Sequence, residues 1–234
     1  MPRTVPRSRT LAALARWPVG IALTSWRYMW RTTPMRRREM SAEEAGAGPP
    51  PLPPDFDGDE VQRPEDGSGP LFHRRYRVTI ADAGLTGAEV MAKIQADPNL
   101  VAPTEFARFQ RIRGKDGAMR VNDEFIVRMP GPWNGPVRVA EVAEHSFRLV
   151  TLRAHLEAGQ IEFRVLEDDD LVVQIQSWAR SGDIFSSLLY DRLRMAKEIQ
   201  LHMWTSTLER IVRLSKGSRR GPLSIETYRF AVDG

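Results

Sequence analysis

QIEFRVLEDDDLVVQIQSWAR, residues 160–180, reads as two β-strands joined by an acidic turn. Apolar and charged side chains alternate along the first strand, in the order Ile161, Glu162, Phe163, Arg164, Val165. A period of two residues is typical of a strand that buries one face. The acidic residues at 167–170 favour an exposed turn over a metal cluster, because turns accept aspartate readily. The stretch therefore predicts an antiparallel β-hairpin.

More strands are expected on the N-terminal side of this hairpin. Patterns of alternating polarity predict four of them, over 105–113, 121–129, 137–144 and 147–153. The segment from Gly114 to Gly117 is typical of a tight turn between the first two. Together with the hairpin, these strands predict a six-stranded antiparallel meander.

Two helices complete the predicted domain. After a strand over 76–80, Thr86 and Glu89 form a capping box that opens a helix ending near residue 95. The second helix is long, with Ser181 as its expected N-cap and an apolar face that continues to about Ser215. We therefore predict an α+β fold, in which a curved antiparallel sheet of about seven strands packs against a long C-terminal helix. A pocket between sheet and helix would suit a small apolar ligand.

The segment TLRAHLEAGQIEF, residues 151–163, resembles the signature of a bacterial and plant family of unknown function. That family belongs to the SRPBCC superfamily of START, polyketide-cyclase and pollen-allergen proteins. Its pattern is roughly Thr-Leu-x-Gly-His-x-x-x-Gly-x-x-x-Phe. Here Ala154 stands in place of the glycine before the histidine, and Leu156 in place of a usual proline. The family's next strand ends in aromatic-x-Arg, which Trp178-Ala179-Arg180 matches.

The resemblance covers about 70–214 and implies the helix-grip fold of that superfamily. In the family, the long helix is rich in arginine and carries a glutamine, as Arg192, Arg194 and Gln200 do here. The family has no agreed reaction, so the resemblance implies a fold that binds ligands and does not imply an activity.

The N-terminal segment carries a charge that the rest of the chain lacks. Nine arginines and no acidic residue lie between Met1 and Arg38, and the remaining residues, 25 basic and 30 acidic, sum to −5. Only ten uncharged residues separate Arg16 from Arg27, so we expect neither a membrane-spanning helix nor a signal peptide there. The segment also holds half of the six tryptophans, at Trp17, Trp26 and Trp30.

Three roles are open for this basic segment, in which we expect short helices over 11–17 and 18–31. It could lie on an anionic membrane surface, or dock on an acidic protein surface such as the chain's own body. It could also bind nucleic acid, which we expect least. The expected contact residues are Arg16, Trp26, Arg27, Trp30, Arg36, Arg37 and Arg38.

Composition divides the chain into four parts. A basic arm rich in Trp and Arg spans 1–40, and a linker rich in Pro and Gly spans 41–70. The helix-grip domain is expected over 71–217. Residues 218–234 would then add an edge strand or dock as a tail.

No sequence motif indicates a catalytic centre or a metal site. Cysteine is absent, and the four histidines do not have the spacing of zinc ligands. The chain has neither a phosphate-binding glycine loop nor a serine nucleophile motif. We therefore expect no catalytic residue, no metal and no cofactor.

Six residues are candidates for contact with a ligand: His155, Glu162, Trp178, Arg180, Arg194 and His202. A hairpin could bring His155 and Glu162 together, giving an imidazole oriented by a carboxylate. Alternatively, His155 hydrogen-bonds the backbone of its own loop. Trp178 and Arg180 share a strand face with two glutamines, which lines the pocket if it points inward and is a solvated strip if it points outward.

These observations lead to three functional hypotheses. The first is a non-catalytic module that binds a small apolar or amphipathic ligand, such as a lipid. The second is a membrane-peripheral or partner-docking protein that acts through the basic arm. The third is an enzyme of the cyclase or hydrolase type. We expect a cytoplasmic protein, membrane-peripheral if the arm binds lipid, and the sequence does not decide its oligomeric state.

Overall fold

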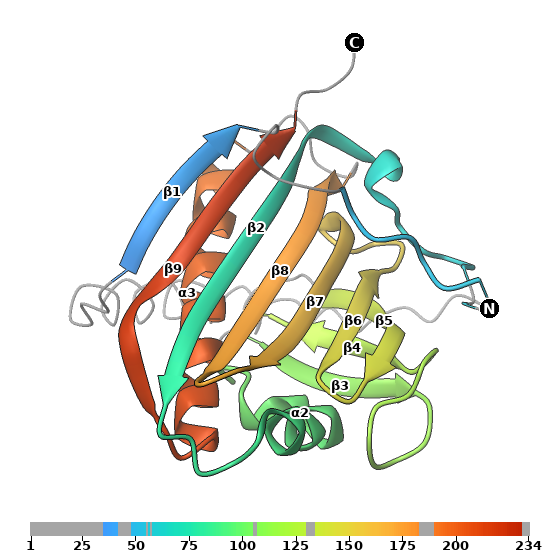
Figure 1. Ribbon diagram of the computed structural model, residues 1–234. Helices are drawn as coiled ribbons and strands as arrows, with labels where there is room; N and C mark the ends of the chain where they lie inside the picture. Colours follow the sequence, from blue (N-terminus) through green and yellow to red (C-terminus); the bar gives the residue numbers. More distant parts are fainter. Residues whose placement is uncertain are drawn as a thin grey trace, which may run out of the picture.

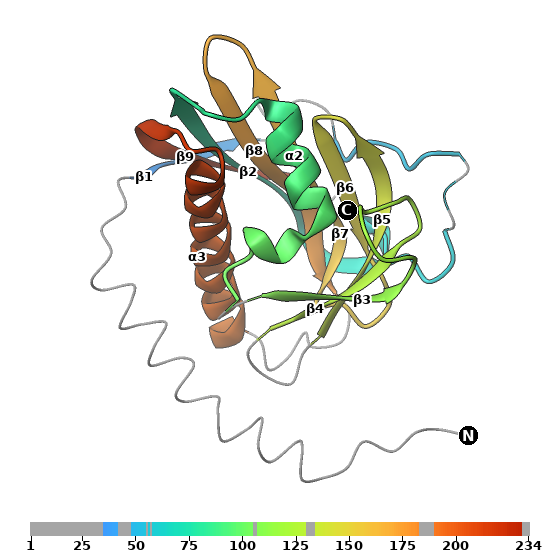
Figure 2. The ribbon, with the colours of Figure 1, turned by 90° about the horizontal axis from the view of Figure 1, so that it is seen from below.

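The computed structural model describes residues 35–41, 48–54, 56, 58–104, 107–129, 134–182 and 190–230. The two short helices expected between residues 11 and 31 lie outside these ranges. Within them, one large β-sheet curves around two α-helices (Figures 1 and 2), so the predicted α+β class is confirmed. Neither of these helices has a stretch long and apolar enough to cross a lipid bilayer.

The sheet has nine strands in the order β1-β9-β2-β8-β7-β6-β5-β4-β3 (Figure 1). Neighbouring strands pair antiparallel, except that β1 runs parallel to β9. The predicted six-stranded meander is confirmed as β3 to β8. The strands are β1 (Met35–Ser41), β2 (Gly67–Ala81), β3 (Arg108–Arg113), β4 (Glu124–Arg128), β5 (Asn134–Ala143), β6 (Ser146–Thr151), β7 (Glu157–Glu167), β8 (Leu171–Gly182) and β9 (Ser218–Phe230).

Two α-helices, α2 (Gly87–Ala96) and α3 (Tyr190–Leu214), lie on the concave side of the sheet (Figure 2). The capping box of α2 is confirmed, because Thr86 Oγ1 accepts from the Glu89 backbone N–H and the Glu89 carboxylate accepts from the Thr86 N–H. α3 contacts β2, β8 and β9, whereas α2 packs on β7. Two short 3-10 helices are η2 (Pro64–Asp66) and η3 (Pro98–Leu100).

The hydrophobic core lies between the concave face and the helices. Leu208 and Ile211 of α3 are at most 1% exposed. Trp204 of the same helix meets the Phe163 ring edge-on, with centroids 5.7 Å apart, and Phe163 stacks on Phe147 at 4.6 Å. The apolar alternation of β7 is thus buried beneath the long helix, as the sequence predicts.

The long helix does not begin where the sequence predicts. Ser181, the expected N-cap, and Gly182 belong to β8, where they pair with Ser68 and Gly67 of β2. The first turn of a helix leaves backbone N–H groups without partners. Pairing with β2 gives the backbone of these residues hydrogen-bond partners, so the strand continues past the expected boundary. The helix is described from Tyr190 and ends at Leu214, close to the expected end.

The connection between β3 and β4 is longer than the predicted tight turn. It spans 114–123, and Val121, which we expected in the second strand, lies in it with 46% of its surface exposed. Arg111 holds this loop open. Its guanidinium donates to the carbonyl oxygens of Lys115 (2.6 Å) and Gly117 (2.7 Å) and pairs with Asp123.

Residues expected in the arm, the linker and the tail take part in the sheet. Within the basic arm expected over 1–40, Met35–Ser41 forms strand β1. β2 begins at Gly67, inside the expected linker, and β9 takes up most of the expected tail. β9 is an internal strand, because β1 and β2 pair with its two sides.

Candidate functional site

The alternation of β8 decides on which face of the sheet each candidate lies. Val173 and Ile175 are buried in the core on the inner face, which is the face toward α2 and α3. Trp178 and Arg180 lie on the opposite, outer face, because residues an odd number of positions apart on a strand point to opposite sides. The interpretation in which the Trp178 face lines an inner pocket is therefore wrong.

His155 lies in the turn between β6 and β7, and the backbone of Glu157 holds its imidazole. Nδ1 of His155 lies 2.9 Å from the N–H of Glu157, which donates to it, and 3.0 Å from the carbonyl oxygen of the same residue. Acceptance from the N–H corresponds to the neutral tautomer that carries its proton on Nε2. Burial lowers the pKa of the His155 imidazole and outweighs the carboxylate and carbonyl oxygens of Glu157, which raise it. His155 is therefore a neutral hydrogen-bond donor near pH 7.

The Nε2 atom of His155 lies on the inner side of the sheet. A Cβ atom on Gly135 would be 2.9 Å from His155 Nε2, so the imidazole occupies the space that a side chain at residue 135 would need. Gly135 shares a strand face with Val137, which is buried in the core. The Cε atom of Met129 would lie 3.5 Å from the same Cβ position. Among the described residues, none accepts a hydrogen bond from His155 Nε2.

Thr151 fixes the turn that carries His155. Its hydroxyl accepts from the N–H of Gly159 (2.9 Å) and donates to the carbonyl oxygen of Gln62 (2.9 Å). Ala154 has a φ of +72°, a left-handed conformation that glycine adopts readily, which explains the glycine of the family pattern. A Cβ on Gly159 would overlap the carbonyl oxygen of Trp178. The signature residues around His155 thus have structural roles.

A segment from the expected linker is tied to the same turn. Val61 forms an isolated antiparallel bridge with Leu152. The N–H of Gln62 donates to the carbonyl oxygen of Thr151 (2.8 Å), and its side-chain amide lies 3.4 Å from the carbonyl oxygen of His155. This part of the linker therefore lies against the end of β6 and supports the His155 turn.

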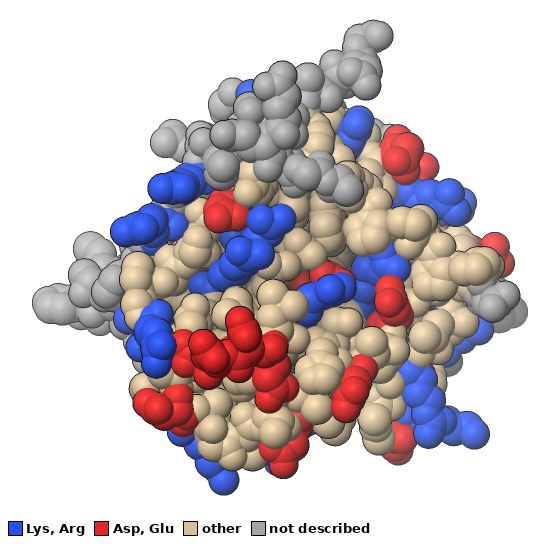
Figure 3. All heavy atoms as spheres, viewed as in Figure 1, with Lys and Arg blue, Asp and Glu red and all other residues tan. Residues whose placement is uncertain are grey.

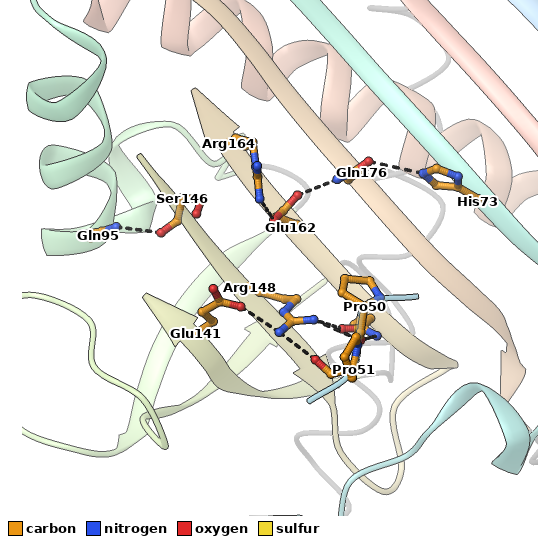
Figure 4. Close-up of polar contacts among 11 residues, drawn as sticks. Pro50, Pro51, His73, Gln95, Glu141, Ser146, Arg148, Glu162, Arg164 and Gln176 are labelled. Atoms are coloured by element: carbon orange, nitrogen blue, oxygen red, sulfur yellow. Dashed lines mark hydrogen bonds and ion pairs between the residues drawn. The ribbon is translucent and has the colours of Figure 1, made fainter. Parts of the chain in front are cut away.

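Glu162 does not approach His155, because it lies on the outer face of β7. Its carboxylate accepts from Nε2 of Gln176 (2.5 Å) and pairs with Arg164 (2.7 Å), as Figure 4 shows. Oε1 of Gln176 in turn lies 3.4 Å from Nε2 of His73. The structure therefore does not form the expected His155–Glu162 pair, and the alternative, in which His155 bonds its own loop, is what it shows.

Trp178 ends a row of three stacked rings on the outer face. Its indole stacks on His73 with centroids 4.8 Å apart, and His73 stacks on Tyr228 at 5.3 Å. Each of the three residues is at most 4% exposed. Burial is the main cause that raises the pKa of Tyr228, followed by its hydrogen bond to Glu226.

Arg148 forms a second polar cluster on the outer face, which the sequence analysis did not single out. Its guanidinium donates to the carbonyl oxygens of Pro50 and Pro51 (3.1 Å each) and pairs with Glu141 (2.7 Å), as drawn in Figure 4. Gln160 also donates to Pro50 (2.9 Å). Basic and acidic side chains are interleaved over this face (Figure 3). The alternating polarity of β6 and β7 could have predicted that Arg148 and Gln160 lie on the same face of the sheet. Nothing in the sequence predicts that Pro50 and Pro51 cover them.

The remaining candidates are spread over the molecule. Arg180 lies on the outer face of β8, and His202 is half-buried on α3. Arg194 belongs to α3, but its side chain lies outside the described part. Among the described residues, no group of His, Asp and Glu side chains is arranged to hold a metal ion.

The residues expected in the basic arm divide between β1 and the part of the chain that is not described. Arg36 and Arg38 are exposed on β1, and Arg37 lies between them. The others, Arg16, Trp26, Arg27 and Trp30, lie outside the described residues.

Several solved structures are similar to this chain at low sequence identity. Ginseng major latex-like protein 151 from Panax ginseng is 15% identical over 63% of this chain and 99% of its own, with a TM-score of 0.46. The di-domain ARO/CYC StfQ from the steffimycin biosynthetic pathway is 10% identical over 65% of this chain, with a TM-score of 0.45. The match covers 52% of StfQ, so this chain spans about half of that protein. No curated protein matches the chain.

A family model matches residues 73–210, which is more than half of the chain. The match runs from His73 on β2 through the meander and the His155 turn into α3. It confirms the predicted resemblance to a family of unknown function. The chain belongs to the family described as a domain of unknown function, DUF1990.

Proposed function

We propose that this domain binds a small apolar or amphipathic molecule on the inner side of the sheet, with a ligand oxygen accepting a hydrogen bond from His155. The observation that carries the proposal is the Nε2–H group of His155. The hydrogen bond from Glu157 fixes its position, and no described residue accepts from it. A ligand carbonyl or hydroxyl oxygen would make a hydrogen bond worth about 0.5–1.5 kcal/mol net.

Apolar side chains near this donor would hold the body of the ligand. Phe125 and Val137 of the inner face belong to the core, and Val127 packs beside them. Met203 of α3 packs with Ala107 in a small apolar cluster next to Val127. Burying apolar ligand surface among such side chains contributes about 25 cal/mol per Å². Affinity would thus come from apolar contact, and orientation from His155.

The proposal involves no chemical step. Nδ1 of His155 is occupied by a backbone N–H, and burial keeps the ring neutral. A proton carrier would need its second nitrogen free or paired with a group that exchanges protons. In this proposal His155 therefore donates a hydrogen bond to the ligand from a fixed position and transfers no proton.

Native mass spectrometry of the purified protein tests the proposal, followed by binding of oleate and of 1-anilinonaphthalene-8-sulfonate. The diagnostic variant is His155→Asn. The side-chain oxygen of the asparagine can still accept from the N–H of Glu157, but the Nε2–H donor of the histidine is lost. His145→Asn is the matched control, because His145 is a partly exposed histidine outside the proposed site. We expect binding that weakens about tenfold in His155→Asn and is unchanged in His145→Asn. A wild-type protein that carries no molecule and binds neither probe would disprove the proposal.

A second candidate function rests on β1. Arg36 and Arg38 are exposed on this strand, which lies at one edge of the sheet. We propose, as an alternative, that the N-terminal part of the chain binds an anionic membrane, where each basic residue contributes about 1 kcal/mol. Replacing Arg36, Arg37 and Arg38 by Ala should then weaken co-sedimentation with anionic liposomes at least tenfold and reduce its salt dependence. Trp26→Ala with Trp30→Ala should weaken it without altering the salt dependence. Undiminished binding by the triple arginine variant would refute this alternative.

A further inference from the structure

Arg180 differs from the other arginines of β2 and of β5 to β8. Each of the others has an acceptor in the sheet, in the pairs Arg74–Glu157, Arg75–Glu226, Arg77–Gln174, Arg138–Glu124, Arg148–Glu141 and Arg164–Glu162. Arg180 makes no hydrogen bond and no ion pair with any described residue, and its Nε atom is buried. It is therefore a cation on the sheet surface without a protein acceptor in the described structure.

Trp178 supplies a second unpaired donor on the same face. Its indole Nε1 is buried without a hydrogen-bond partner, while its ring stacks on His73. Residues two positions apart on a strand point to the same side, about 7 Å from each other. The two donors thus face one region of the outer surface.

Small residues surround Arg180 in this region. A Cβ atom on Gly67 would lie 2.9 Å from the Cβ of Arg180, and equally close to that of Ala158. Ala158 is fully buried, and η2 packs over this end of β7 and β8. Asp66 of η2 uses its carboxylate to accept from the N–H of Arg63 (2.7 Å). The other acid of this short helix, Glu65, is exposed, and neither acid pairs with Arg180 in the described structure.

We propose that Arg180 and Trp178 form a binding site for an oxyanion, a carboxylate or a phosphate group, on the outer face of the sheet. Buried donors without acceptors are rare in native proteins, because each costs about 1–3 kcal/mol. A guanidinium can give a carboxylate or phosphate two parallel hydrogen bonds, and the indole N–H can give a third. The site lies on the opposite side of the sheet from His155, so it does not depend on the proposed function.

The indole N–H resonance of Trp178 in ¹⁵N–¹H spectra of the full chain tests the site directly. Trp178→Phe assigns this resonance among those of the six tryptophans. The probes are inorganic phosphate and acetate, each added at constant ionic strength. We expect a saturable shift of the Trp178 resonance with at least one of them, while the other indole resonances stay in place.

Two arginine variants separate a built site from general attraction of anions. Arg180→Gln should weaken binding of the anion at least tenfold. Arg164→Gln, the matched control, removes an arginine on the same face that already pairs with Glu162 (2.7 Å), and it should change binding less than twofold. If Arg180→Gln does not fold, Trp178→Phe serves in its place. It keeps a ring against His73 but removes the donor, and it should weaken phosphate binding severalfold by calorimetry.

Two results would overturn the proposal. One is that neither anion shifts the Trp178 resonance at concentrations on the order of tens of millimolar. At these concentrations even a site with a binding free energy of only a few kcal/mol is occupied. The other is an equal loss of binding in the Arg180 and Arg164 variants. Phosphatidylcholine vesicles with and without phosphatidic acid then identify the source of the anion. Binding to the acidic vesicles that Arg180→Gln abolishes indicates a lipid headgroup, and phosphate binding alone indicates a free anion.

Discussion

The imidazole of His155 lies against Gly135, where a Cβ atom on residue 135 would be only 2.9 Å from its Nε2. Gly135→Ala should therefore displace the ring and lower the free energy of unfolding by about 1–3 kcal/mol, as overpacking does in other cores. Urea denaturation measures this change. Gly48→Ala is the control, because nothing lies within 4 Å of a Cβ at that position. Equal effects of the two substitutions would contradict the packing described for His155.

The stability of the protein should depend on pH through His155. Burial lowers the pKa of this group in the folded protein below its ordinary value of 6.5, so the unfolded chain takes up the proton first as pH falls. The contribution of His155 to stability is complete above the unfolded pKa. It is lost as pH decreases through 6.5 toward the folded pKa, by at most about 1.4 kcal/mol per pH unit.

Urea denaturation of the wild type and His155→Asn between pH 5 and 8 isolates this effect, since the other titrating groups are shared. The wild-type curve should fall more steeply on the acid side than the curve of the variant. Two parallel curves would show that His155 titrates alike in the folded and unfolded chains.

Ala154→Gly should stabilise the protein, which is unusual for a glycine substitution. Ala154 has a φ of +72°, and this left-handed conformation costs an ordinary residue about 1–2 kcal/mol relative to its preferred geometry. Part of that gain is lost to the greater freedom of glycine in the unfolded chain, so we expect a net increase of about 1 kcal/mol or less. The melting temperature should rise. Ala143→Gly, in strand β5 without a positive φ, should lower it.

Thr151→Val keeps the shape of the side chain but removes the hydroxyl that joins Gly159 to Gln62. The buried N–H of Gly159 then loses its partner, which should cost about 1–3 kcal/mol of unfolding free energy. Thr79→Val on β2 provides the comparison, because it makes the same change on another strand of the same sheet. If Thr79→Val costs as much as Thr151→Val, the hydroxyl of Thr151 has no special role in the turn.

The parts of the fold that the sequence predicted correctly are those whose pattern involves residues close to one another in the chain. The alternation of Ile161 with Glu162 and the capping box of Thr86 with Glu89 involve residues within one strand or one helical turn. The start of the long helix was wrong because Ser181 can open a helix or extend a strand, and its pairing with Ser68 decides between them.

The candidate site was predictable only in part, for the same reason. His155 follows from its place in a recognisable turn, but its neighbour Gly135 comes from β5, and Gln62 comes from a segment that composition marked as a linker. Arg148 and Pro50 are 98 residues apart, and no pattern in either segment indicates the other. Which strand face turns inward also depends on the whole sheet, so the position of Trp178 stayed open until the fold was known.

The parallel pairing of β1 with β9 has a consequence for the order in which the molecule assembles. Met35 pairs with Leu223, so the first strand in the described chain has its partner in the last one. A ribosome releases β1 long before β9 exists, whereas each strand of the meander meets a neighbour made immediately before it. Long-range pairings of this kind form late, because a long loop must close before they contribute. β1 therefore cannot pair before β9 has been made, and we expect its docking to come late in folding.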